Sequence, residues 1–179
     1  MDSNAQGRVG LVFQYWPQVW SIESTHFHRP NMLISEVVTG RKRTPLIGTY
    51  LPPSTLEHLP DLEEAMTRFW DQYPIVLGYL NSNTGQSQNP LSQQVSDLLM
   101  QFELMDLLHH FWQCWRFRHI KTWSQARQGR LMQVICDYIL GAYWCSFEML
   151  GVRGINNYPS YHSVLQARLL IYPTLAGHD

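Results

Sequence analysis

The first part of the chain alternates short apolar runs with turn residues, a pattern typical of consecutive β-strands. Four such runs precede the double proline at positions 52 and 53: residues 9–15 (VGLVFQY), 19–25 (VWSIEST), 31–40 (NMLISEVVTG) and 43–51 (RTPLIGTYL). The TGRKR segment between the last two runs indicates a hairpin turn. We therefore expect four strands before the first helix.

Apolar residues at helical spacing then predict two helices separated by a strand. The first helix is expected from about Pro60, and its apolar positions are Leu62, Ala65, Met66, Phe69 and Trp70. The second is expected over 92–111, with Ser92 or Ser96 as its cap and with an apolar stripe of Val95, Leu98, Leu99, Phe102 and Leu107. The segment between them, 74–81 (PIVLGYLN), is typical of a buried strand that opens into a polar loop.

Three further runs predict the last strands: 130–141 (RLMQVICDYILG), 146–155 (SFEMLGVRGI) and 160–171 (SYHSVLQARLLI). Several strands followed by alternating helices and strands favour an α/β fold with mixed sheets, in which helices lie outside two layers of sheet. We expect residues 1–179 to form a single domain, with 1–6 and 172–179 as flexible ends.

Composition narrows the class of protein only a little. Hydrophobic residues make up 45% of the chain and charged residues 15%, and the net charge of −1 neither favours nor excludes nucleic acid. The three cysteines, Cys114, Cys136 and Cys145, have no CxxC spacing, so neither a zinc site nor a disulfide framework is expected. No apolar run is long enough to span a membrane, and the start lacks the apolar core of a signal peptide. These observations favour an intracellular protein, cytoplasmic or nuclear.

Polar residues stand at the ends of three predicted strands. Tyr79 and Asn81 belong to GYLN, Asp137 interrupts the apolar CDYIL, and His162 follows a Pro-Ser turn in YPSYHSVL. An unpaired buried carboxylate is costly, so Asp137 needs a partner or a function. An aspartate that orients a histidine recurs in hydrolytic sites. From spacing alone, a structural aspartate beside a satisfied core histidine explains the same residues.

Together with LIGTYLPP (46–53), these motifs resemble, in order and spacing, those of the endonuclease/exonuclease/phosphatase superfamily. More closely, they resemble the apurinic-endonuclease-like domain of LINE-type retrotransposons, especially fungal ones. The resemblance runs from about Gly7 to Leu170. It implies a four-layered α/β sandwich with two mixed sheets, here lacking the first strands. It also implies cleavage of phosphodiester bonds with a divalent metal, usually magnesium.

The resemblance assigns roles to four residues. Tyr50 matches a tyrosine near the scissile phosphate, and Asn81 matches the asparagine of the family's GDLN motif, which helps hold phosphate and the attacking water. Asp137 matches the aspartate that orients the catalytic histidine, and His162 matches that histidine. Amide and imidazolium groups offer hydrogen-bond donors to charge that develops in the transition state.

Two departures from the family pattern bear on catalysis. Tyr79 stands where the family has the aspartate credited with activating water, and Tyr161 stands where it has an aspartate implicated in metal binding. A phenol is a poor base at neutral pH and a poor magnesium ligand. We also expect the family's upstream metal-binding glutamate to be missing, because none of the early acids of the chain is in a matching context. We therefore expect no metal site, unless residual activity remains and uses Mg²⁺ or Mn²⁺.

A basic, aromatic stretch lies between Asp106 and Asp137, where no acid intervenes. Its basic residues are Arg116, Arg118, Lys121, Arg127 and Arg130, and its aromatic residues include Trp115, Phe117 and Trp123. Such a stretch suits phosphate contacts and base stacking, while a solvated loop with half-buried aromatics is the alternative. The adjacent pair His109 and His110 does not favour a metal site, because neighbouring residues on a helix point in different directions.

Three hypotheses about function follow. The first is a degenerate, retrotransposon-derived endonuclease-like domain without phosphodiesterase activity, kept as an intracellular protein that binds DNA or RNA. The second is a residual metal-dependent DNA endonuclease that uses Asn81, Asp137 and His162. The third is a host-adapted protein with a protein partner and no nucleic-acid role.

Overall fold

The computed structural model of the chain describes residues 21–29, 31–39, 41–53, 56–82, 90–107, 121–142, 146–153, 162 and 164–170. Strands and helices follow one another in these residues as in an α/β protein. In order they are β1 (Ser21–Arg29), β2 (Met32–Thr39), β3 (Lys42–Tyr50), α1 (Leu59–Phe69), the 3-10 turn η1 (Trp70–Gln72), β4 (Ile75–Tyr79), α2 (Pro90–Gln101), β5 (Leu104–Asp106), β6 (Trp123–Arg127), β7 (Arg130–Val134), β8 (Asp137–Ala142), β9 (Ser146–Arg153) and β10 (Val164–Leu170).

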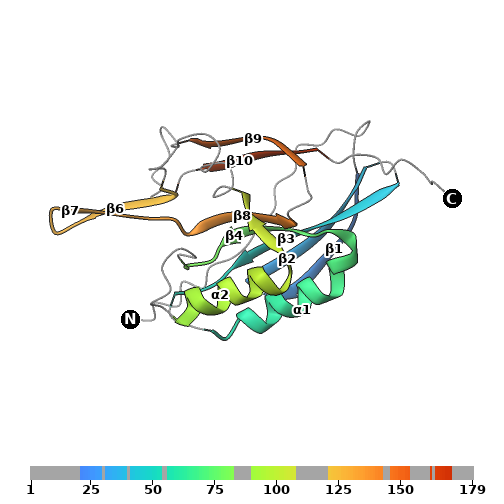
Figure 1. Cartoon of the computed structure of the whole chain (residues 1–179), viewed down its shortest axis with the longest axis horizontal. Helices are drawn as coiled ribbons and strands as arrows, with labels where there is room; N and C mark the ends of the chain where they lie inside the picture. The colour runs from blue at the N-terminus through green and yellow to red at the C-terminus, as the bar shows by residue number, and fades with distance from the viewer. Residues whose placement is uncertain are drawn as a thin grey trace.

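A six-stranded mixed sheet forms the centre, in the order β1-β2-β3-β4-β8-β5. Its strands pair antiparallel except for β3 and β4, which are parallel because the chain returns through α1 between them. Figure 1 shows α1 and α2 on one side of this sheet and the antiparallel pair β9–β10 on the other. The described residues thus supply a helical layer, the central sheet and a two-stranded sheet on its other side (Figure 1).

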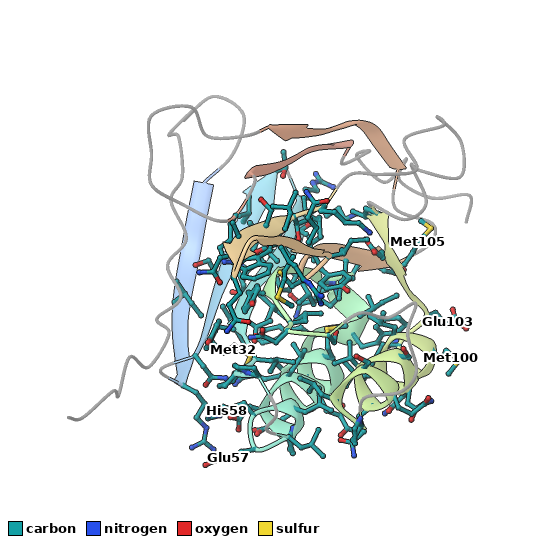
Figure 2. The ribbon with its side chains drawn as sticks, turned by 90° about the vertical axis from the view of Figure 1, so that its left-hand side faces the viewer. Met32, Glu57, His58, Met100, Glu103 and Met105 are labelled. Atoms are coloured by element: carbon teal, nitrogen blue, oxygen red, sulfur yellow. The ribbon has the colours of Figure 1, made fainter. Side chains whose placement is uncertain are left out.

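The core on the helix side of the sheet is the larger one. Helix α1 buries the apolar positions predicted from its spacing, except that Trp70 is half-buried and follows the helix. Side chains of this core include Met32, Ile47, Leu62, Met66, Val76, Leu98 and Leu140. Figure 2 shows Met100 and Glu103 at the outer edge of this half of the molecule, and Met100 is 68% exposed. The buried stripe of each helix therefore faces the sheet.

A smaller cluster lies on the opposite face of the sheet. It contains Ile75, Leu107 and Ile139, with Leu46, Leu77 and Met105 packed against them. Because successive side chains of a strand point to opposite faces, Val76 and Leu140 belong to the helix side, whereas Ile75 and Ile139 belong to the other. Both faces of the central strands are therefore covered, as expected of a multilayered sandwich.

Two expectations about element boundaries are wrong. The second helix ends at Gln101, because Glu103 adopts a left-handed φ of 44° and Leu104–Asp106 pairs with β8 as strand β5. The segment 130–141 forms two strands rather than one, because the chain leaves extended pairing at Ile135 and Cys136. For Leu104–Asp106, the apolar spacing of so few residues fits a helix or a strand equally well. Pairing with β8 is what makes this segment a strand.

The expected cap of α2 is also wrong. The helix begins at Pro90, so Ser92 and Ser96 lie within it, and the Ser96 hydroxyl donates to the Ser92 carbonyl at 2.8 Å. Proline is favoured in a first turn because it has no N–H to satisfy there.

Some expectations fall on residues that the structure does not describe. The predicted strand at 9–15 and the predicted ends, 1–6 and 172–179, lie outside the described residues, as do His109 and His110. Within the part that is described, no helix has both the length and the hydropathy to cross a membrane.

Candidate functional site

Strand register brings three of the sequence-predicted positions into one row. Tyr50 of β3 pairs with Tyr79 of β4, and Tyr79 pairs in turn with Asp137 of β8. By strand alternation, all three side chains lie on the face of the sheet away from the helices, the face of Ile75 and Ile139. The ends of three neighbouring strands therefore place two phenols and a carboxyl group side by side.

Aromatic contacts hold this row together. The rings of Tyr50 and Tyr79 stack with their centroids 5.6 Å apart and their planes 11° from parallel. The edge of the His162 ring approaches Tyr79 at 5.0 Å, with an interplanar angle of 77°. Offset and edge-on arrangements are the ones that aromatic rings prefer. The phenol of Tyr79 is thus held between a second phenol and an imidazole.

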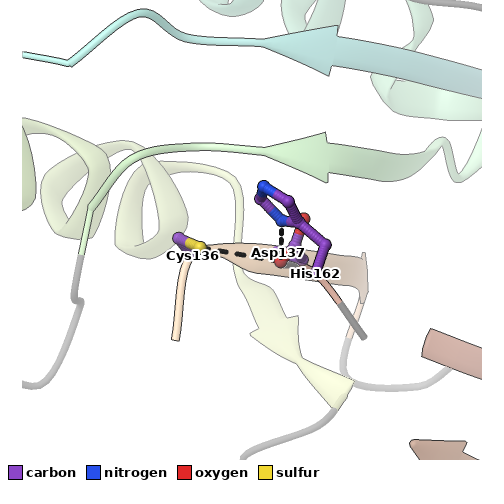
Figure 3. Close-up of side chains that lie close together, drawn as sticks. All are labelled: Cys136, Asp137 and His162. Atoms are coloured by element: carbon purple, nitrogen blue, oxygen red, sulfur yellow. Dashed lines mark hydrogen bonds and ion pairs between the residues drawn. The ribbon is translucent and has the colours of Figure 1, made fainter. Parts of the chain in front are cut away.

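Asp137 and His162 are brought together from positions 25 residues apart in the chain. Nδ1 of His162 lies 3.0 Å from Oδ2 and 3.2 Å from Oδ1 of Asp137 (Figure 3). A carboxylate only accepts hydrogen bonds, so Nδ1 carries the proton and donates it, and Nε2 is the remaining ring nitrogen. An isolated β-bridge between His162 and Trp123 of β6 fixes the histidine backbone. This contact is the one that orients a histidine in many hydrolytic sites.

Thr122 supports the aspartate, and no sequence motif pointed to it. Its fully buried hydroxyl oxygen accepts the N–H of Cys136 at 2.9 Å and the N–H of Asp137 at 3.1 Å. Successive N–H groups of a regular strand point in opposite directions, so their convergence on one oxygen shows that the chain bends just before β8. This bend is why Cys136 and Asp137 face the same site.

Cys136 is the second residue that the sequence motifs did not single out. It is buried, and its thiol lies 3.6 Å from Oδ2 of Asp137 and 3.7 Å from the hydroxyl of Thr122. Burial, reinforced by the negative charge of Asp137, raises the pKa of this thiol to about 12. The thiol is therefore neutral at physiological pH and acts as a hydrogen-bond donor to the carboxylate.

Tyr79 is also held in its neutral form. Burial raises the pKa of its phenol well above the ordinary value of 10.0, and the neighbouring acidic groups of Cys136, Asp137 and Tyr50 add to the effect. Because the phenol stays protonated near neutral pH, it cannot act as a general base there. The group that faces Asp137 is therefore an aromatic hydrogen-bond donor and not a second carboxylate.

Asn81 connects the loops that follow β3 and β4. It adopts a left-handed φ of 49°, a conformation that asparagine tolerates better than most residues, and its amide donates to the Leu51 carbonyl at 2.7 Å. The N–H of Leu51 in turn donates to the Tyr79 carbonyl at 2.9 Å. Asn81 thus lies near the row of Tyr50, Tyr79 and Asp137 and also holds the loops in place.

The described donors of this site do not fit magnesium. A magnesium ion is held by oxygen ligands that include one or two carboxylates and requires nearly ideal octahedral geometry. Here Asp137 supplies a single carboxylate, which is engaged by His162 and Cys136, and the neighbouring position carries the neutral phenol of Tyr79. Tyr161, the other residue expected to replace a family aspartate, lies outside the described residues.

The basic stretch is partly described, and it is not a loop there. Strands β6 and β7 pair as a hairpin in which Arg127 is opposite Arg130 across a Gln-Gly turn with positive φ at both positions. Lys121 and Arg130 are exposed, and so are Leu131 and Met132 of β7, at 66% and 48%. Figure 1 shows this hairpin extending away from the central sheet. Arg116 and Arg118 lie outside the described residues.

Comparisons with known proteins find likeness in structure and not in sequence. No protein-family model matches the chain, and no curated protein matches it. The endonuclease domain of TRAS1, a telomere-specific non-LTR retrotransposon, is similar with a TM-score of 0.63 at 14% identity, over 80% of this chain and 65% of that one. An endonuclease/exonuclease/phosphatase family protein from Leptotrichia buccalis is similar with a TM-score of 0.56 at 12% identity, over 78% of this chain and 54% of that one.

A third similar structure is D. rerio TDP2 complexed with single strand DNA product. Its TM-score is 0.57 at 13% identity, over 82% of this chain and 64% of that one. The chain therefore spans between about half and two thirds of the length of these structures. At such low identity the likeness concerns the fold alone, and it confirms the α/β sandwich expected from the four sequence motifs.

Proposed function

We propose, from the premise that this chain has the endonuclease/exonuclease/phosphatase fold, that it is a degenerate endonuclease-like domain of retrotransposon origin. In this proposal it binds nucleic acid inside the cell and does not cleave it. A retrotransposon endonuclease domain is among the structures that resemble it, which supports the proposed origin.

The observation that carries the proposal is the pairing of Tyr79 with Asp137. From the motif resemblance, an aspartate is expected at position 79. Together with Asp137 it would provide two carboxylate ligands for a cation such as magnesium. The phenol found there is held neutral by burial and by the acidic groups around it. Loss of general acid–base help alone costs roughly 10²–10⁴-fold in rate, and loss of the metal removes electrostatic stabilisation as well.

Nucleic-acid binding is proposed for the β6–β7 hairpin and the basic residues around it. Lys121 and Arg130 are exposed there, and the chain leading to the hairpin adds Arg116 and Arg118. Arginine and lysine that neutralise phosphates make binding salt-dependent, because counterions are released from the nucleic acid. The structure of the similar D. rerio TDP2 holds a single strand DNA product, which supports testing single strands first.

Fluorescence anisotropy with labelled single-stranded DNA, duplex DNA and RNA tests this proposal. Affinity is expected to fall steeply between about 50 mM and about 200 mM salt, by a slope that scales with the phosphates contacted. The variants Arg116→Ala/Arg118→Ala and Lys121→Ala/Arg130→Ala should each weaken binding and flatten that slope. Arg68→Ala, at an exposed position of α1, is the matched control and should change neither.

Absence of binding at low salt would contradict the nucleic-acid role. The alternative of a host-adapted protein with a protein partner would then be the better account, since the exposed Leu131 and Met132 lie on the same hairpin.

The contact between Asp137 and His162 favours a second candidate function, a residual metal-dependent endonuclease. Nicking of supercoiled plasmid in the presence of Mg²⁺ or Mn²⁺ distinguishes it from the first. The first proposal expects no nicking above the level of a His162→Ala variant. Nicking by the natural chain that is abolished by His162→Ala and by chelation would establish the nuclease and overturn the loss of cleavage.

A further inference from the structure

Three side chains with different donor atoms converge beside the row of tyrosines. The thiol of Cys136, a carboxylate oxygen of Asp137 and a ring nitrogen of His162 all lie within 4.8 Å of one another. The thiol sulfur is 3.6 Å from Oδ2 of Asp137, and Nδ1 of His162 is 3.0 Å from the same oxygen. Figure 3 shows Cys136 and His162 approaching the carboxylate of Asp137, each joined to it by a dashed line.

These separations are close to those of ligands around one small cation. Tetrahedral zinc has bonds of about 2.3 Å to sulfur and about 2.0–2.2 Å to nitrogen and oxygen, which places neighbouring ligand atoms about 3.4–3.6 Å apart. The sulfur–oxygen distance already has this value. The nitrogen–oxygen distance needs to open by a few tenths of an ångström, and the sulfur–nitrogen distance needs to close by rotation of the side chains.

The backbone holds these groups in place before any ion is bound. The two N–H groups that converge on the hydroxyl of Thr122 fix the bend that turns Cys136 and Asp137 to the same side. His162 is held by its bridge to Trp123 and by its ring contact with Tyr79. Supporting contacts of this kind orient metal ligands and raise metal affinity.

The three side chains differ in their exposure to solvent: Cys136 is buried, whereas Asp137 and His162 are partly exposed. Cys136 is 3% exposed, whereas the side chains of Asp137 and His162 are 21% and 38% exposed. An ion can therefore enter past the histidine, and a water molecule can complete its coordination there. The hydroxyl of Thr122 lies 3.7 Å from the sulfur of Cys136, so it can donate a hydrogen bond to the thiolate that binds the ion.

We propose that Cys136, Asp137 and His162 bind one zinc ion, with water as the fourth ligand. A thiolate, an imidazole and a carboxylate are the ligands that zinc takes in proteins, and the sulfur disfavours magnesium and calcium. On binding, Cys136 releases its thiol proton to solvent. The imidazole gives up its Nδ1 proton to solvent and takes one on Nε2, so that Nδ1 coordinates the ion in place of donating to Asp137. This site is independent of the nucleic-acid binding proposed above.

The zinc site departs from the expectation, drawn from the cysteine spacing, that the chain has no zinc site. That expectation relied on the absence of CxxC spacing, which detects ligand pairs close together in the chain. Here two ligands are consecutive residues at a bend, and the third comes from a segment 25 residues further on.

Isothermal titration of zinc into the chelator-treated, reduced full chain tests the proposal. One ion per chain is expected, and Cys136→Ser should weaken zinc binding by about 100-fold or more. Cys114→Ser and Cys145→Ser are matched controls that should leave affinity unchanged. Cobalt provides an independent readout in the natural chain, where it should give the intense absorption of a four-coordinate site and a thiolate-to-cobalt charge-transfer band.

Full-strength binding by Cys136→Ser, or loss of binding in either control variant, would place the ion elsewhere and overturn the proposal. Absence of both zinc binding and the thiolate band in the natural chain would also overturn it. Circular dichroism shows whether each variant folds. Should Cys136→Ser fail to fold, Asp137→Asn and His162→Gln are expected to weaken zinc binding, and the cobalt spectrum of the natural chain decides without any variant.

Discussion

Tyr79 lies directly opposite Asp137 in the antiparallel pairing of β4 and β8, with its ring stacked on Tyr50 at 5.6 Å. A neutral aromatic donor therefore faces the one carboxylate of this row. Like charges directly opposite each other across two strands are destabilising, so a carboxylate at position 79 would require a cation between the two strands. The phenol removes that requirement and fills the space with aromatic contacts.

Replacement of the phenol by a carboxylate should make the fold depend on metal. Without metal, Tyr79→Asp is expected to destabilise the chain by about 2 kcal/mol, because it loses the aromatic stack and places two negative charges together. Saturating Mn²⁺ should restore about that amount, since an ion that binds only the folded state stabilises it. Thermal unfolding with and without Mn²⁺ after chelator treatment measures both effects. Tyr79→Phe keeps the aromatic stack, so Mn²⁺ should not change its thermal stability. If Mn²⁺ also fails to stabilise Tyr79→Asp, a carboxylate at position 79 does not create a metal site.

The hydroxyl of Thr122 should contribute strongly to the stability of the fold, although no sequence motif pointed to this residue. In Thr122→Val, the N–H groups of Cys136 and Asp137 lose their common acceptor in a buried position. The expected loss in the free energy of unfolding is about 2–4 kcal/mol, measured by urea denaturation. Thr122→Ser keeps the hydroxyl and should cost only about 1 kcal/mol, the value of a lost methyl group. Similar losses in both variants would show that packing, not hydrogen bonding, is what Thr122 contributes.

Alkaline pH should destabilise the metal-free chain through Cys136. Its thiol has an ordinary pKa of 9.0 and a folded pKa of about 12, so above pH 9 the unfolded chain releases this proton while the folded chain retains it. The contribution to stability is therefore complete below pH 9 and is lost between about pH 9 and about pH 12, at up to about 1.4 kcal/mol per pH unit. Above pH 10 the raised pKa of Tyr79 acts in the same direction.

Urea denaturation of the chelator-treated chain at several pH values measures this slope. Cys136→Ser should flatten it between about pH 9 and about pH 10, whereas Cys145→Ser should retain the slope of the natural chain. Equal slopes in the natural chain and in Cys136→Ser would contradict a thiol held in its neutral form.

Gly78 should tolerate no side chain, because β3 and β4 lie too close together there. A Cβ atom at this position would overlap the carbonyl oxygen of Thr49 on the neighbouring strand. Gly78→Ala is therefore expected to cost about 3 kcal/mol or more and to disturb the row formed by Tyr50 and Tyr79. Gly129→Ala is the matched control, since its Cβ would meet nothing within 4 Å and only its φ of 73° opposes the change, at about 1 kcal/mol. Urea denaturation compares the two, and a Gly78→Ala variant as stable as the control would refute the close approach.

The sequence by itself determined the elements whose signals are local. The turn between β2 and β3, the start of α1 near Pro60 and the strand β4 were predicted within a few residues, because turn residues and apolar periodicity act over short distances. Four short motifs also indicated the fold, which the likeness to solved structures confirms. They named Tyr50, Tyr79, Asp137 and His162, and the structure brings these four together.

Tertiary structure alone decided what depends on contacts between distant segments. The end of α2 depends on the pairing of β5 with β8, and the division of 130–141 depends on β7 pairing with β6 while β8 pairs with β4 and β5. A local apolar pattern does not show which strands will pair. Thr122 and Cys136 join the site only because the chain bends before β8 and brings one hydroxyl under two N–H groups. The bend lies where the chain passes from the β6–β7 pair to β8 of the central sheet, so it becomes visible only when the strands are assembled.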